Sequence, residues 1–190
     1  MASILGAFAG MFSADAAQKG LSPLAGREGE DMAAECVTLM DDPLYPINPS
    51  PFDDEGTPSV AKAVIKDGKL ETLLHNLKTA KKAGVKSTSN GGRSSAGSPV
   101  GVRITNFYIA PKEGTLGQLI SEMGDGLLIT DFSGLHAGVN PVSGKFSVLC
   151  KGRLIKDGRD VRAVNEITLS GDFTELLRSI VRVGGDLRFS

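Results

Sequence analysis

The chain has no tryptophan, two cysteines and two histidines among its 190 residues, and aromatic side chains make up 5% of it. Cys36 and Cys150 lie far apart, without the CxxC or Cys-His spacing of the common zinc and redox motifs. Isolated cysteines of this kind are typical of buried free thiols in a reducing compartment. Since 41% of the residues are hydrophobic but few are aromatic, we expect a core of Val, Ile, Leu and Ala.

Long apolar runs and an excess of one charge are missing as well. The apolar run within Met1–Ala17 is shorter than the roughly 20 residues that cross a bilayer, and it lacks the positive start of a signal peptide. These features predict a cytoplasmic protein with no membrane span.

The net charge of −1 hides an uneven distribution along the chain. Glu28–Glu55 holds nine acidic and no basic residues, and Lys78–Lys112 holds seven basic and no acidic residues. The simpler interpretation is that the two segments lie together and compensate. A nucleic-acid surface is the less favoured alternative, because interleaved aromatic residues are few.

Turn signals are abundant. Lys66-Asp67-Gly68-Lys69 recurs as Lys156-Asp157-Gly158-Arg159, each time between apolar runs, and an Asp-Gly pair in this setting predicts a two-residue hairpin. We therefore expect an α+β domain, an antiparallel β-rich body with short helices, two Asp-Gly hairpins and an internal pseudo-symmetry. Expected helices cover 4–17, 76–83, 115–123 and 172–183, and expected strands 36–40, 60–65, 69–74, 102–110, 127–132, 146–155 and 159–169.

Several sequence stretches, in order along the whole chain, resemble one known family. They are Phe52–Gly56, Lys86–Gly91, Thr105–Phe107, Gly134–Phe146 and Val183–Leu187. Together they resemble the C-terminal domain of the PmbA/TldE–TldD proteins, once called modulators of DNA gyrase. Residues 1–190 would then be one such domain. The resemblance also implies that the family's N-terminal domain and extreme C-terminus are absent, so that the chain is a truncated form or fragment.

The resemblance indicates which branch of the family is involved. In the catalytic TldD branch, a helix carries HExxxH, whose histidines bind metal and whose glutamate acts on water. These ligand positions fall on Gly6 and Met11 here and the glutamate position on Ala7, none of which can serve. A further cysteine ligand lies beyond the position where this chain ends, Ser190. The resemblance therefore implies the non-metal PmbA/TldE branch, with no catalytic residue, metal ligand or cofactor of its own.

The function implied is that of a non-catalytic partner of a cytoplasmic TldD-type metalloprotease that processes small unstructured peptides. Its partners would be a TldD-type subunit and an extended peptide, in a homo- or hetero-oligomer. Asn90, Gly91, Arg93, His136 and Asn140 are the candidate substrate-facing residues.

Four other groups of residues have side chains or backbone suited to chemistry. Asp131, Ser133 and His136 suggest an independent hydrolase, but they lie within six residues and no oxyanion-hole motif accompanies them. We interpret His75 and His136 as turn or strand-end residues. Ser87–Gly101, rich in Ser and Gly, is expected to be a mobile surface loop. Acidic residues at 41, 42 and 53–55 could bind a hard cation, but turn and capping roles are more consistent with their spacing.

Overall fold

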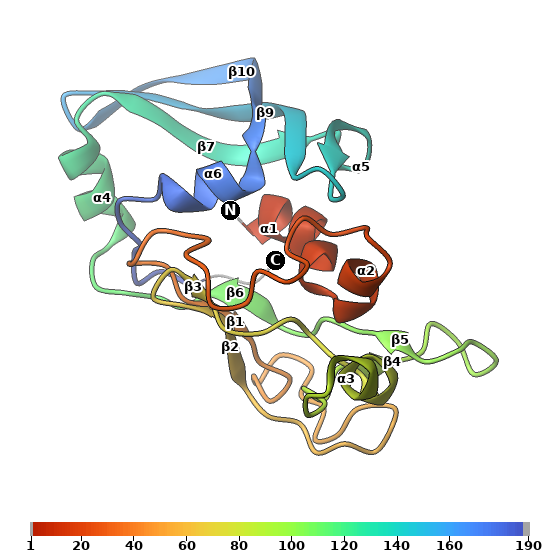
Figure 1. Cartoon of the computed structure of the whole chain (residues 1–190). Helices are drawn as coiled ribbons and strands as arrows, with labels where there is room; N and C mark the ends of the chain where they lie inside the picture. The colour runs from red at the N-terminus through yellow and green to blue at the C-terminus, as the bar shows by residue number, and fades with distance from the viewer. Residues whose placement is uncertain (1, 188–190) are drawn as a thin grey trace.

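The computed structural model describes residues 2–187 and confirms an α+β fold built from antiparallel sheets and short helices. Expectations about Met1 and Ser190 lie outside this range. One sheet has the strand order β3-β2-β1-β6, a second has β10-β9-β7 with β8 added to β9, and β4 pairs with β5 (Figure 1). The strands are β1 Leu39–Asp41, β2 Lys62–Lys66, β3 Lys69–Leu70, β4 Gly91–Gly92, β5 Gly101–Val102, β6 Phe107–Ile109, β7 Gly126–Ser133, β8 Val139–Asn140, β9 Lys145–Lys156 and β10 Arg159–Asp172.

Each Asp-Gly turn connects two antiparallel neighbours. Lys66 pairs with Lys69 across the first turn, and Lys156 pairs with Arg159 across the second. In both turns the aspartate and the glycine have positive φ, between 46° and 83°, as a tight two-residue turn between twisted strands requires. The two turns belong to different sheets, and β3 has 2 residues where β10 has 14. Internal pseudo-symmetry therefore stays a hypothesis.

The expected N-terminal helix is wrong as a single element, because the chain breaks at Ser13. The structure has α1 Ala2–Phe8, a 3₁₀ turn η1 Ala9–Phe12 and α2 Ala14–Gln18. Ser13 is extended and its hydroxyl caps α2, while the Ala14 amide donates to the Leu74 carbonyl at 2.9 Å. Pairing with the segment after β3 therefore overrides a helix pattern that is continuous in sequence.

For the other helices, the predicted starts agree with the structure better than the predicted ends. α3 Leu77–Ala83 is capped by Asn76 and ends at Gly84, and α4 Leu116–Met123 begins with a capping box at Thr115. α6 Phe173–Arg178 is capped by Asp172, where the expected helix starts, but ends earlier than expected. The segment after α6 turns toward α4 instead, where the Lys112 amide donates to the Gly184 carbonyl. The short helix α5 Leu135–Gly138 was not predicted, and Val181, which falls within the expected helix 172–183, lies beyond the end of α6 and is 95% exposed.

Three expected strands differ clearly from the observed ones in their bounds. The predicted strand 102–110 divides into β5 and β6, because the backbone between them turns to meet acidic residues: the Thr105 amide donates to the Asp41 carboxylate at 2.8 Å. The strand predicted at 36–40 is β1, displaced toward the C-terminus, and the one predicted at 69–74 keeps strand geometry only in β3.

The core lies between the two main sheets and is centred on α1 and α6 (Figure 1). Its largest side chains are phenylalanines, which corrects the expectation of a purely aliphatic core. Phe8 is fully buried and stacks on Phe173 with ring centroids 4.4 Å apart, while Phe146 of β9 meets Phe8 edge-on at 6.0 Å. Few aromatic residues are present, but they gather where helices and sheet meet.

Glycine at 152 is predicted to be essential for pairing β9 with β7. A Cβ at Gly152 would overlap the carbonyl oxygen of Leu128, whereas one at Gly6 meets nothing within 4 Å. We expect Gly152→Ala to lower the free energy of unfolding by about 2–4 kcal/mol through backbone displacement. The matched change Gly6→Ala should be neutral or stabilising by up to about 1 kcal/mol, because alanine favours a helix. Urea unfolding of both variants measures the contrast, and equal stabilities would contradict it.

Candidate functional site

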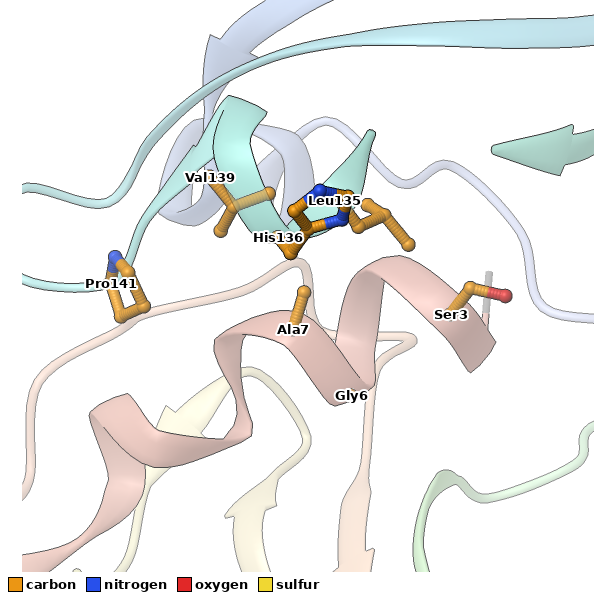
Figure 2. Close-up of a pocket in the computed structure, with 7 residues that line it drawn as sticks. All are labelled: Ser3, Gly6, Ala7, Leu135, His136, Val139 and Pro141. Carbon is orange, nitrogen blue, oxygen red and sulfur yellow. The ribbon is translucent and has the colours of Figure 1, made fainter. Parts of the chain in front are cut away.

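A pocket, called here the α1–α5 pocket, lies between α1 and α5. Its lining comes from two segments, it holds about 430 Å³, and Figure 2 shows the His136 ring above Ala7. Gly134, with φ of 76°, turns the chain out of β7 into α5, and Gly138 lies so close to β9 that a Cβ would overlap the Ser147 carbonyl. The lining residues are Ser3, Gly6, Ala7, Leu135, His136, Val139 and Pro141.

The chemistry of this pocket is limited. Its polar side-chain groups are the imidazole of His136 and the hydroxyl of Ser3, and the remaining lining is apolar or glycine. Met11, the second position implied for a metal ligand, is 1% exposed and belongs to the core rather than to the pocket. Zinc in proteases needs three protein ligands, so the residues present do not fit a metal centre. Within residues 2–187, no group of three or more His, Cys, Asp or Glu side chains is arranged to hold a metal ion.

The hydrolase interpretation of Asp131, Ser133 and His136 is not supported by the geometry. Asp131 pairs with Lys151 and Ser133 with Leu149 across the β7–β9 ladder, while His136 lies beyond the turn on α5. The Asp131 carboxylate accepts a hydrogen bond from the Phe132 amide at 2.8 Å. In the part of the chain that the structure describes, no hydrogen bond joins these three side chains, which a nucleophile, base and orienting acid require.

The acidic residues at 41 and 53–55 have structural roles, as their spacing indicated. Asp41 is fully buried and accepts hydrogen bonds from the amide and hydroxyl of Thr105, the side-chain amide of Asn90 and the ammonium of Lys62, all within 2.8–2.9 Å. Every oxygen of this carboxylate therefore has a partner within the chain.

The turn at 53–55 connects the acidic and basic halves of the sequence. Asp53 accepts from the Gly91 amide at 2.8 Å, Asp54 from the Arg93 amide at 2.7 Å, and Glu55 from the Leu77 amide at 2.7 Å. The two oppositely charged segments thus lie side by side, as the simpler interpretation of their charges predicted, and Arg103 forms an ion pair with Asp54 at 3.7 Å.

The candidate substrate-facing residues do not gather in one site. Asn90 is 1% exposed and Gly91 is buried in β4, and both bind within the chain, so the expected mobile surface loop is wrong for 89–92. Arg93, His136 and Asn140 are exposed. Arg93 directly follows β4, whereas His136 lies in α5 and Asn140 in β8. The β4–β5 pair lies beside α3 and apart from α5 (Figure 1). Asn140 uses its side-chain oxygen to cap the turn at Val142.

His75 is a buried residue that sequence reasoning placed at a turn or strand end. It is 5% exposed, and its ring nitrogen Nδ1 has no hydrogen-bond partner among the described residues. Desolvation by burial lowers the pKa of the imidazole below its usual 6.5, although the charge of Glu28 and a backbone hydrogen bond at Thr79 act in the opposite direction. The ring is therefore held in its neutral form.

Both cysteines are free, Cys150 buried and Cys36 partly exposed, as their spacing predicted. None of the helices within residues 2–187 combines the length and the apolar character needed to cross a membrane.

The fold and the comparisons with known proteins define the class: the chain is a domain from a metallopeptidase family. The family model described as the PmbA/TldA metallopeptidase C-terminal domain matches residues 1–190, and the chain belongs to the PmbA/TldD family. A proposed modulator of a DNA gyrase from Thermotoga maritima is 42% identical and superposes with a TM-score of 0.93, over 99% of this chain and 43% of that one. TldE from Thermococcus kodakarensis is 30% identical with a TM-score of 0.87, over 96% and 42%.

A curated relative, a metalloprotease of Archaeoglobus fulgidus, is 35% identical over 185 residues, which are 96% of this chain and 42% of the relative. The chain therefore spans well under half the length of the relatives it matches. The fold and the family are shared with these proteins over nearly all of the present sequence.

Proposed function

We propose that this domain serves as a non-catalytic partner of a TldD-type metalloprotease. One observation carries the proposal: Gly6 and Ala7 line an open pocket at the helix where the catalytic branch would place metal ligands and a glutamate. Without those side chains the pocket can hold a ligand but lacks the metal ligands and the glutamate with which the catalytic branch would activate water. The similarity to a solved TldE supports the same branch, and the free thiols are consistent with a cytoplasmic setting.

The proposed ligand is a segment of a small unstructured peptide. A hollow of about 430 Å³ with largely apolar walls accommodates an apolar side chain of an extended chain. The exposed imidazole of His136 and the hydroxyl of Ser3 would hydrogen-bond to the peptide backbone, a type of contact that tolerates many sequences. Under this proposal one subunit holds the peptide and the TldD-type subunit cleaves it, so both subunits would be needed.

The first test is cleavage of an unstructured peptide by the isolated chain, by a TldD-type subunit and by the two together. We expect cleavage only when the TldD-type subunit is present, and association of the two by light scattering. Cleavage by the isolated chain that survives a chelator and is lost in His136→Ala would contradict the proposal and favour an independent hydrolase.

The second test fills the pocket. Gly6 lines it and Gly10, one turn along, does not, although a Cβ at either position meets nothing within 4 Å. In the reconstituted pair, Gly6→Leu is expected to reduce peptide cleavage by about tenfold, equivalent to roughly 1.4 kcal/mol of binding, while Gly10→Leu stays within about twofold. Equal rates for the two variants, with association unchanged, would show that the pocket has no part in holding the peptide.

A further inference from the structure

The backbone of His75 holds a separate part of the chain, residues 87–90, which leads into the β4–β5 hairpin. The His75 amide donates to the hydroxyl of Thr88 at 2.6 Å. Its carbonyl accepts from the Thr88 amide at 3.2 Å, the Asn90 amide at 3.3 Å, and the hydroxyls of Ser87 and Thr88 at 3.2 and 3.1 Å. One residue thereby supplies nearly all the contacts that attach this segment to the start of α3.

The same residue has the only buried side-chain nitrogen or oxygen without a hydrogen-bond partner in the part of the chain that the structure describes. Nδ1 of the ring is shielded from solvent, so a proton added to it would create a buried charge with no acceptor in place. An unpaired charge in such a setting costs several kcal/mol and forces either a shift of the ring or local opening.

The groups around the ring determine how far a protonated imidazole would be stabilised. Glu28, from the loop after α2, is the charged side chain that acts on the imidazole, and Thr79 of α3 offers its backbone. Ser87 and Thr88, whose hydroxyls donate to the His75 backbone carbonyl, carry no charge. A proton on Nδ1 would therefore create a buried charge without an acceptor, and either the ring must shift or the neighbouring segment must open to relieve it.

We propose that His75 is an acid-sensitive latch, in which protonation of its buried ring opens the 87–90 segment. The opening stays local. Gly91 and Arg93, further along the hairpin, are bound separately by the carboxylates of Asp53 and Asp54. Asn90 also binds Asp41, which in turn pairs with Lys62, so the opened segment keeps one attachment to the first sheet. The latch is independent of the proposed function, because it lies in a part of the chain remote from the α1–α5 pocket.

The direction of the pH dependence follows from the lowered pKa. Above pH 6.5 the ring is neutral whether the segment is closed or open, and the closed state has its full stability. Below that pH the open form binds the proton more readily than the closed form, so closure loses stability down to the lower pKa of the buried ring. The free energy of opening therefore falls as the solution is acidified from neutrality.

Hydrogen exchange of the Thr88 and Asn90 amides tests the latch directly, since both donate to the His75 carbonyl. After correction for the intrinsic exchange rate, their opening constant should rise by up to about tenfold for each pH unit below 6.5. The Leu119 amide of α4, bonded to Thr115, is the internal control and should show no such rise.

His75→Phe keeps an aromatic ring at this position but cannot bind a proton, so it should abolish the pH response. The control variant His136→Phe should keep the response. His75→Gln provides a second uncharged variant should phenylalanine not be accommodated. Equal protection at pH 7.5 and 5.5 in the unmodified chain, or a response that persists in either His75 variant, would overturn the proposal.

Discussion

Replacing Phe8 with alanine is expected to lower the free energy of unfolding by about 3–5 kcal/mol. The ring is fully buried, stacks on Phe173 and meets Phe146 edge-on, so it joins α1, α6 and β9 at one point. Truncation would remove both ring contacts and leave a cavity. The two helices and the sheet around it could fill this cavity only by shifting their positions. Urea denaturation monitored by circular dichroism gives the change.

Phe52 provides the matched control, because it is the same side chain with 61% of its surface exposed. Phe52→Ala should change the stability by no more than about 0.5 kcal/mol. A Phe8→Ala variant as stable as Phe52→Ala would mean that the aromatic cluster does not organise the core.

Replacing Asp41 with alanine is expected to cost a similar amount, about 3–5 kcal/mol, for an electrostatic reason. The carboxylate is buried and is the common acceptor of Thr105, Asn90 and Lys62. Its removal would deprive four donor groups on these three residues of their shared acceptor, one of them an ammonium group whose side chain is only 13% exposed. Thermal and urea unfolding at neutral pH measure the loss.

The control for Asp41 is an ion pair at the surface. Glu30 pairs with Arg27 at 2.8 Å but is about half exposed, so Glu30→Ala should cost no more than about 0.5 kcal/mol. A second variant, Asp41→Ala combined with Lys62→Met, removes the uncompensated charge and should recover part of the lost stability. No recovery at all would indicate that the Thr105 and Asn90 hydrogen bonds, rather than the ion pair, account for the loss.

Local chemistry explains which elements could be predicted. Thr115 and Asp172 satisfy the free amides of the helices they cap, and Gly84 ends α3 with positive φ, so each boundary depends on a few neighbouring residues. The helix pattern from Ile4 to Ala17 is equally regular, yet it breaks at Ser13, because hydrogen bonds to Leu74 become available only in the folded chain.

The same contrast between local and tertiary effects applies to the candidate site. The resemblance placed the ligand positions of the catalytic branch on Gly6 and Met11 and its glutamate on Ala7, whose side chains are not zinc ligands, and this expectation depends on residue types alone. The pocket that Gly6 and Ala7 share with His136 could not be predicted, because it depends on how α5 packs across α1. Asn90 was misjudged because its Gly- and Ser-rich surroundings are typical of a surface loop, whereas Asp41, 49 positions earlier, draws it into the interior.

By itself the sequence determined the α+β class, the free state of the two cysteines, most helix starts and the family, because these depend on composition, on residues within one turn of each other or on matched stretches. The tertiary structure alone decided the phenylalanine core, the break at Ser13, the buried partners of Asp41 and the unpartnered ring of His75. Each of these depends on groups distant in sequence, and the energy of a buried charge or cavity is set by all the groups that surround it, which no local pattern specifies.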